Sequence, residues 1–105
     1  FNDEQFSSIL IDNVLEHILD PSKLLKDVYR VSKINAKIVI SVPGLKGYEY
    51  DDDHKKFYDK KKLNDTLHKC GYKFVKDFYT PFKSELLNRN MRQYCMHGVY
   101  KKIND

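Results

Sequence analysis

The chain has 105 residues, of which 41% are apolar and 32% charged, and its formal net charge is +4. These values fit one small globular domain and exclude an intrinsically disordered chain. No run of about 18 apolar residues occurs, so we expect no transmembrane helix. The start of the chain has no basic region before an apolar core, so we expect no secretory signal either.

The cysteines and lysines indicate the cellular location and bear on whether the protein binds nucleic acid. Cys70 and Cys95 stand far apart and form no Cys-x-x-Cys pair, which predicts reduced thiols and a cytoplasmic location rather than a disulfide or zinc framework. Lysines gather over residues 55–62, but aspartates flank them. A surface that follows nucleic-acid phosphates needs an unbroken basic stripe, so we expect no nucleic-acid partner.

The first predicted element is a buried strand over residues 7–12, because an apolar run stops there at two polar residues. A helix follows from Asp20, whose carboxylate can cap free backbone N–H groups, with Pro21 at the first helical position. We expect this helix to end near residues 32–33. Its apolar residues recur at helical spacing and form one buried stripe of Leu24, Leu25, Val28 and Val31.

A second strand is predicted over residues 37–42, where branched apolar residues run almost continuously, as in a strand covered on both faces. Pro43 and Gly44 close it. Residues 45–57 are acidic and aromatic and predict a long loop. Loops of that length in compact domains are more often functional than not.

The second half of the chain predicts a helix and a pair of strands. Asp59 is expected to cap a helix over residues 60–70, which Gly71 ends. A strand over residues 72–79, a helical turn through residues 86–87 and a strand over residues 91–101 follow. The last two strands have no full crossover helix between them, so we expect them to be antiparallel. The fold class is therefore α/β, with a mixed sheet of about four strands that is parallel at first and reversed at the end.

Five segments, in this order and spacing, resemble a class I S-adenosylmethionine-dependent methyltransferase. Their counterparts in the family are the fourth strand with the Val-Leu-Glu-His segment after it, the next helix, the fifth strand, an Asp-His element, and the start of a later strand. In this chain they are residues 6–20, 24–32, 37–43, 53–58 and 71–75. The resemblance implies a partial Rossmann-like fold and, for the parent protein, methyl transfer from S-adenosylmethionine to an acceptor.

One family element has no counterpart here. The family holds its cofactor mainly through a glycine-rich loop after its first strand, and the four glycines of this chain form no such loop. The resemblance therefore implies the carboxyl-terminal half of a methyltransferase domain. We expect this chain to be inactive alone and to need the missing amino-terminal half to hold S-adenosylmethionine. The family's glycine pair before its fifth strand is also replaced, by a turn in which Asn35 can adopt left-handed backbone angles.

The polar tip of the first strand is the predicted cofactor site, because ligands of open α/β sheets bind just past the carboxyl ends of strands. Asp12, Asn13 and Val14 form this tip. In the resembled family the tip borders the adenine and methionine portions of the cofactor. The alternative is that Asp12 and Asn13 only satisfy backbone groups where the chain turns sharply.

Two further positions are candidates through the resemblance. Glu16 and His17 match part of a Glu-x-x-Glu-His cluster that holds a divalent ion in some similar O-methyltransferases, but Asn13 replaces the first glutamate. We therefore expect no metal and a structural role for His17 beneath the site. His54 is the candidate catalytic base or substrate contact. The alternative for His54 is a hydrogen bond that fastens its loop to the strand tip.

The family resemblance alone does not specify the methyl acceptor or the partners. The expected acceptor is a small molecule or a modified biomolecule, and no membrane partner is expected. Four aromatic residues either line an acceptor pocket or cover the sheet edge: Tyr48, Tyr50, Phe57 and Tyr58. The alternative function is a non-catalytic methyltransferase-like module. The first strand would then lack a neighbour on one side, and an open apolar edge recruits another chain, so we expect a homo-oligomer.

Overall fold

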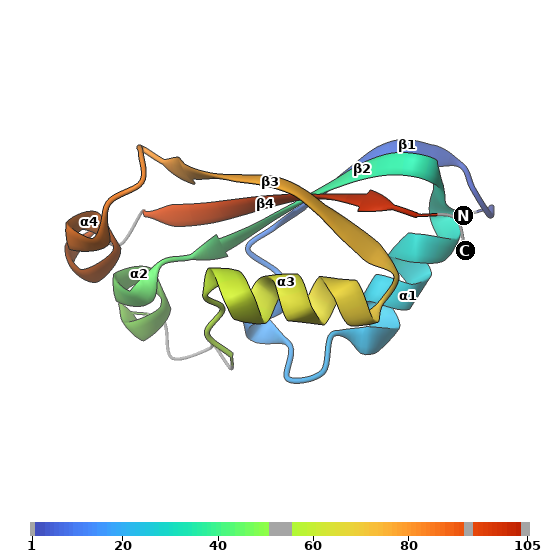
Figure 1. The fold of residues 1–105 in the computed structure, drawn as a ribbon. Coiled ribbons are helices and arrows are strands. Elements are labelled where there is room, and N and C mark those ends of the chain that lie inside the picture. Colours follow the sequence, from blue (N-terminus) through green and yellow to red (C-terminus); the bar gives the residue numbers. More distant parts are fainter. Residues whose placement is uncertain (1, 51–55, 92–93, 104–105) are drawn as a thin grey trace.

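Strands and helices alternate along the chain, as the α/β class requires. The computed structural model describes residues 2–50, 56–91 and 94–103, and of Tyr50 the backbone alone. Figure 1 labels the elements, which are β1 (Phe6–Asp12), the 3-10 turn η1 (Leu15–His17), α1 (Ser22–Val31), β2 (Ser32–Pro43), α2 (Leu45–Tyr50), α3 (Lys60–Lys69), β3 (Tyr72–Thr80), α4 (Glu85–Asn90) and β4 (Cys95–Lys102).

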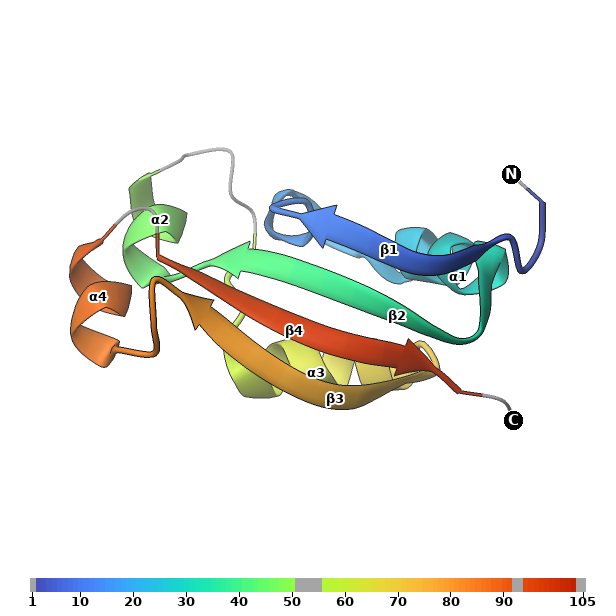
Figure 2. The ribbon, with the colours of Figure 1, turned by 90° about the horizontal axis from the view of Figure 1, so that it is seen from above.

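The four strands form one mixed sheet in the order β1-β2-β4-β3, seen from above in Figure 2. β1 runs parallel to β2, whereas β4 is antiparallel to both β2 and β3. A parallel pair needs a crossover connection, and α1 provides it, while the antiparallel β3–β4 pair needs only the short α4. The predicted mixed sheet, parallel at first and reversed at the end, is confirmed.

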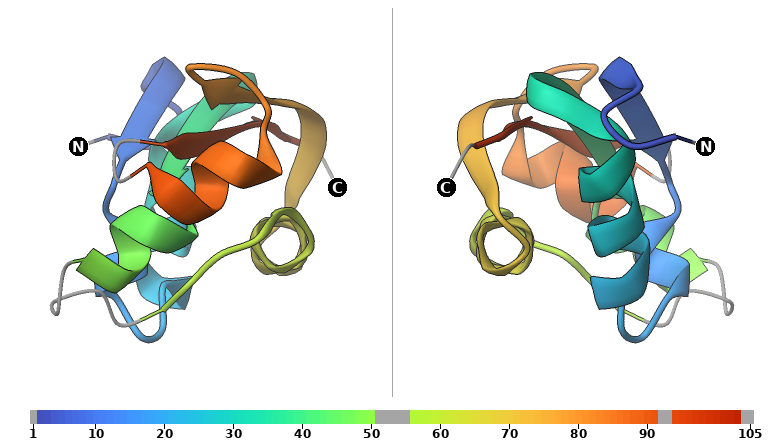
Figure 3. Two further views of the ribbon diagram at one scale, coloured as in Figure 1. Left: turned by 90° about the vertical axis from the view of Figure 1, so that its left-hand side faces the viewer. Right: turned by 90° about the vertical axis from the view of Figure 1, so that its right-hand side faces the viewer.

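The core lies on one face of the sheet, which α1 and α3 cover (Figure 3). Ile38, Ile40 and Val42 of β2 are fully buried there, and Leu25 of α1 and Leu67 of α3 pack against the same cluster. Side chains alternate between the faces of a strand, so their neighbours point the other way. On that opposite face no helix is among the described residues, and Leu10 and Phe78 are 65% and 44% exposed.

The helix ends follow the capping signals with one small shift. Asp20 accepts a hydrogen bond from the Ser22 N–H at 3.1 Å, but α1 begins at Ser22, and Pro21 precedes the helix rather than opening it. The Asp59 carboxylate accepts from the Lys62 N–H at 2.8 Å and caps α3 as predicted. Gly71 follows α3 with a φ of +93°, which confirms it as the residue that ends this helix.

The predicted loop over residues 45–57 is wrong for its first part, because residues 45–50 form α2. The Leu45 N–H donates to the side-chain oxygen of Asn88 in α4 at 2.8 Å, and the Tyr48 N–H donates to the Gly44 carbonyl at 2.9 Å. A contact between residues so far apart in sequence leaves no local signal.

No helix among the described residues is long and apolar enough to cross a membrane.

Two strands also start elsewhere than predicted. β2 begins at Ser32, directly after α1, and its pairing with β1 shifts between the Phe6–Ser32 and Ser8–Lys37 pairs. Asn35 lies in this irregular part with a φ of +68°, so the predicted left-handed angle is confirmed. β4 begins at Cys95 instead of residue 91.

Gly71 generates the first prediction. A Cβ atom there would lie 2.9 Å from the Tyr29 Cε2 atom, and the left-handed backbone disfavours any L side chain. Gly71→Ala should therefore lower the free energy of unfolding by about 1–2 kcal/mol in urea denaturation. The control is Lys69→Ala on the exposed side of α3, which should stay within about 0.5 kcal/mol. Equal effects of the two variants would contradict this account.

Candidate functional site

The tip of β1 is held beside the carboxyl end of β2. Asp12 is the partner of Ser41 in the parallel ladder, and the Asn13 N–H donates to the Ser41 carbonyl at 2.9 Å. Asn13 then adopts a left-handed φ of +53°, which turns the chain out of the sheet towards η1. Asp12, Asn13 and Val14 are all exposed at this edge. The three predicted cofactor residues are therefore together, at the end of the sheet where open α/β folds bind ligands.

The alternative reading of this tip requires hydrogen bonds from its side chains to nearby backbone. Among the residues that the structure describes, neither the Asp12 carboxylate nor the Asn13 amide makes a hydrogen bond. The backbone still explains why an asparagine stands at position 13, because asparagine tolerates left-handed angles better than most residues. Asp12 has no such structural role among the described residues, so its carboxylate stays a candidate ligand contact.

Glu16 and His17 lie just beneath the tip, in η1. Glu16 is fully buried, and its carboxylate oxygen Oε2 is 3.9 Å from Nε2 of the partly exposed His17. The Glu16 carbonyl accepts a hydrogen bond from the Lys56 N–H at 3.0 Å, which ties η1 to the segment before α3. Within the described ranges, no three His, Cys, Asp or Glu side chains gather as metal ligands. His54 lies outside the described residues, so its role stays a prediction.

Tyr58 is buried next to Glu16. Its hydroxyl has no hydrogen-bond partner among the described residues. Burial, and then the neighbouring Glu16 carboxylate, raise the pKa of Tyr58 to about 12. Tyr58 is therefore a neutral, buried wall residue at physiological pH rather than a proton carrier.

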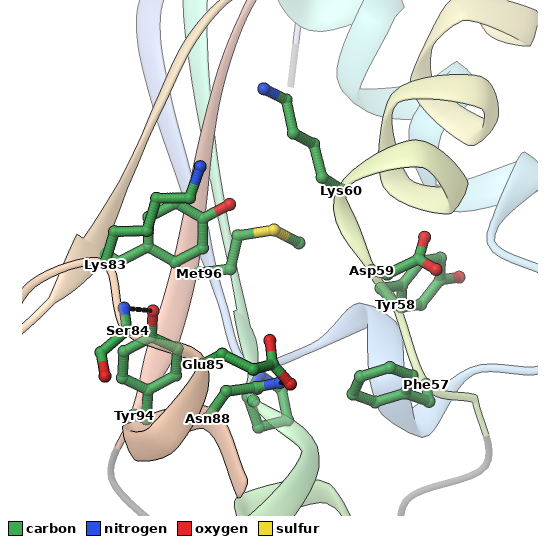
Figure 4. Close-up of a pocket in the computed structure, with 13 residues that line it drawn as sticks. Phe57, Tyr58, Asp59, Lys60, Lys83, Ser84, Glu85, Asn88, Tyr94 and Met96 are labelled. Carbon is green, nitrogen blue, oxygen red and sulfur yellow. Dashed lines mark hydrogen bonds between the residues drawn. The ribbon is translucent and has the colours of Figure 1, made fainter.

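A cavity of about 230 Å³ opens at the same end of the sheet (Figure 4). It lies between the exit of β2 at Pro43 and Gly44, the segment that enters α3, and the hairpin that carries α4. Phe57 and Tyr58 line it, and Tyr48 packs edge-on against Phe57 with ring centroids 5.4 Å apart. The side chain of Tyr50, the fourth predicted aromatic, lies outside the described residues.

The other half of this cavity comes from residues that the sequence did not single out. Tyr79 and Tyr94 stack at 5.9 Å with their planes 19° apart, and Met96 and Lys83 complete that side. Tyr79 is paired with Met96 across the β3–β4 ladder. The antiparallel pairing was predictable, but its register was not, and the register decides which side chains share the cavity.

A polar cluster occupies the opposite face near the same edge. The His97 Nδ1 atom is 2.6 Å from the Ser41 hydroxyl, and its Nε2 atom is 3.0 Å from the Thr80 hydroxyl. The imidazole also stacks on Phe78 with centroids 4.5 Å apart. Burial lowers the pKa of His97. Both ring nitrogens are engaged, so this cluster explains the local packing without a ligand.

Comparisons with known proteins support the predicted family. The methyltransferase domain family matches residues 1–40. An uncharacterized protein of Methanocaldococcus jannaschii is 33% identical over 94 residues, which make up 79% of this chain and 46% of that protein. The chain therefore spans about half the length of the curated relative that it matches.

Solved structures show the same fold. A SAM-dependent methyltransferase from Archaeoglobus fulgidus superposes with a TM-score of 0.71 at 20% identity, over 95% of this chain and 61% of that one. The 1,6-didemethyltoxoflavin-N1-methyltransferase of Burkholderia thailandensis, solved with its acceptor and S-adenosylhomocysteine, gives 0.75 at 13% identity, over 99% and 47%. The [4+2]-cyclase SpnF gives 0.73 at 10% identity, over 100% and 53%. The predicted fold and resemblance are confirmed.

The buried tyrosines generate the second prediction. Tyr58→Phe removes a hydroxyl that has no partner among the described residues, so it should raise the free energy of unfolding by about 1 kcal/mol. Tyr72 is equally buried, but its hydroxyl donates to the Leu25 carbonyl at 2.8 Å. Tyr72→Phe should therefore lower stability by about 1 kcal/mol. Urea unfolding at neutral pH checks both, and a matching loss in the two variants would refute the assignment.

The pH dependence of stability follows from the same residue. Between pH 10 and about 12, Tyr58 is neutral in the folded chain but ionised in the unfolded chain. Unfolding then releases a proton, so stability should fall as the pH rises through this window. Tyr58→Phe should show a shallower fall in urea midpoints from pH 9 to pH 12. A slope unchanged by the substitution would contradict the raised pKa.

Proposed function

We propose, on the premise that this chain resembles class I methyltransferases in sequence and has their fold, that the parent protein transfers the methyl group of S-adenosylmethionine to an acceptor. The observation that carries the proposal is the exposed tip Asp12–Asn13–Val14 beside the carboxyl end of β2. The Asp12 carboxylate makes no hydrogen bond to the described residues, and Val14 is apolar and 37% exposed. A carboxylate fits the O–H and N–H donors of a nucleoside, and an apolar side chain fits its ring face.

Methyl transfer needs few catalytic side chains. S-adenosylmethionine supplies an electrophilic methyl group on a sulfonium. An electron pair of the acceptor forms the new bond to the methyl carbon, the carbon–sulfur bond breaks, and its electrons stay on sulfur. The acceptor's proton leaves to solvent or to a base. Alignment of the two reactants provides much of the rate, so this chain's contribution is to place and orient them.

We further propose that S-adenosylmethionine binding requires a glycine-rich segment besides these 105 residues. Glycine lets backbone approach a ligand closely, and none of the four glycines stands in such a loop. The curated relative is matched over 46% of its length, so the rest of that protein has room for such a segment.

We also propose the class of acceptor and a cytoplasmic location. A small molecule or modified biomolecule fits better than a nucleic-acid strand, because carboxylates neutralise lysines of α3. Lys60 pairs with Asp77 at 3.3 Å and Lys61 with Asp65 at 3.2 Å. The thiols of Cys70 and Cys95 are free, which favours the cytoplasm.

A second candidate function is a non-catalytic module that associates through β1. β1 ends the sheet, so one side of its backbone has no strand partner among the described residues. β3, at the other end, carries Lys73 and Lys76, which discourage pairing with a further chain. β1 has no charge before Asp12.

Calorimetry with S-adenosylhomocysteine on the full-length protein tests the first proposal. The protein should bind it, and Asp12→Ala should weaken the affinity about tenfold, because a hydrogen bond to a charged group contributes about 1.5–3 kcal/mol. Asp27→Ala, an exposed carboxylate on α1 that pairs with Lys23, is the matched control and should bind normally. The 105-residue chain alone should give no heat. Absence of binding by the full-length protein would overturn the proposal.

Light scattering on the isolated chain tests the second candidate. If β1 recruits another copy, the chain should be a dimer or larger, and Leu10→Lys should shift it to a monomer because the exposed edge gains a charge. Phe82→Lys, at a similarly exposed apolar residue outside β1, is the control and should not change the mass. A monodisperse monomer of the unmodified chain at high concentration would remove this candidate.

A further inference from the structure

The cavity at the exit of β2 has the shape and lining of a small-ligand subsite. Its volume of about 230 Å³ exceeds the roughly 150 Å³ cavity that suffices for benzene. It therefore has room for one substituted ring. Figure 4 shows that the lining side chains come from two sides, the segment that enters α3 and the hairpin.

The walls of the cavity favour a flat ring. Tyr79 and Tyr94 stack on the hairpin side, and Phe57 stands on the α3 side. Tyr94 and Met96 are buried, at 3% and 6% exposure. The Tyr94 hydroxyl accepts a hydrogen bond from the Ser84 N–H at 2.9 Å, which fixes the ring in place. Aromatic rings prefer offset-stacked or edge-on contacts with other rings, so these walls suit a planar ligand.

The carboxylates of the cavity are already engaged. Glu85 accepts from the Arg89 Nε atom at 2.8 Å, and Asp59 caps α3 by accepting from the Lys62 N–H at 2.8 Å. The Glu85–Arg89 pair also lowers the pKa of Glu85, which keeps its charge. Arg89 therefore balances the charge of Glu85, whereas Asp59 keeps its charge and directs it to the N-terminus of α3.

One cation of the cavity remains available. Lys60 is paired with Asp77 at 3.3 Å. Lys83 has no carboxylate within ion-pair distance among the described residues, and its ammonium lies 5.8 Å from the centre of the Tyr79 ring. A ligand that stacked on this aromatic wall would therefore bring its substituents near an uncompensated ammonium. A cationic ligand would meet repulsion from Lys83 at the same place.

We propose that this cavity binds a planar, single-ring molecule that carries a carboxylate or another anionic group, with Lys83 pairing with the anion and Tyr79 and Tyr94 contacting the ring. The inference rests on the proposed function in one respect: such a ligand would be the methyl acceptor. The cavity and the predicted cofactor tip lie at the same end of the sheet, because β1 and β2 are parallel and the hairpin end of β3 and β4 pairs beside Pro43.

The methionine methyl groups allow a direct test without any cofactor. Met96 lines the cavity, whereas Met91 does not. In protein labelled with ¹³C at its methionine methyl groups, 4-hydroxybenzoate should shift the Met96 signal saturably and leave the Met91 signal in place. Met→Leu variants assign both signals. Phenol, which lacks the anion, and cyclohexanecarboxylate, which lacks the flat ring, should both bind more weakly.

Lys83→Gln replaces the ammonium by a shorter, uncharged polar side chain. Because Lys83 is exposed, the fold should survive. The variant should weaken 4-hydroxybenzoate binding about fivefold and leave phenol binding unchanged. Lys33→Gln, on an exposed part of β2, is the control and should bind normally. An unmoved Met96 signal, equal binding of the three probes, or normal binding by Lys83→Gln would overturn the inference. Loss of S-adenosylhomocysteine binding with the Met96 shift retained would instead overturn only the proposed methyl transfer.

Discussion

The parallel pairing of β1 with β2 is the constraint on which the rest of this structure depends. Five consecutive pairs, from Ser8–Lys37 to Asp12–Ser41, fix the register, and the Asn13 N–H extends the pairing to the Ser41 carbonyl. A shift by one residue would move Ile9 and Ile11 from the core face to the open face. It would also move Asp12 away from the exit of β2. Burial of the β2 isoleucines therefore specifies both the core and the position of the candidate cofactor tip.

The strand register also determines where the cavity forms. Pro43 pairs with Cys95 and Thr80 pairs with Cys95 from the other side, so the exit of β2 and the β3–β4 hairpin end together. The cavity forms where they meet, on the face that α3 covers, and the His97 cluster with Ser41 and Thr80 forms on the other face. The candidate cofactor tip and the candidate acceptor subsite thus share one end of one sheet.

Much of the fold could be predicted from short-range sequence patterns. The apolar runs of β1 and β2, the Asp59 cap and Gly71 after α3 depend on neighbouring residues, and so does the left-handed angle at Asn35. Features that depend on distant contacts were missed. α2 is held by Asn88 across the molecule, and the cavity wall of Tyr79, Tyr94 and Met96 depends on strand register. The availability of the Asp12 carboxylate could likewise be seen only once its surroundings were placed.

We propose that residues 12–14 form one wall of a nucleoside-binding cleft. A crystal structure of the full-length protein with S-adenosylhomocysteine tests this placement. The nucleoside should contact Asp12, Asn13 or Val14 beside the exit of β2. A nucleoside bound elsewhere on the protein, with this tip covered by other parts of the chain, would contradict it.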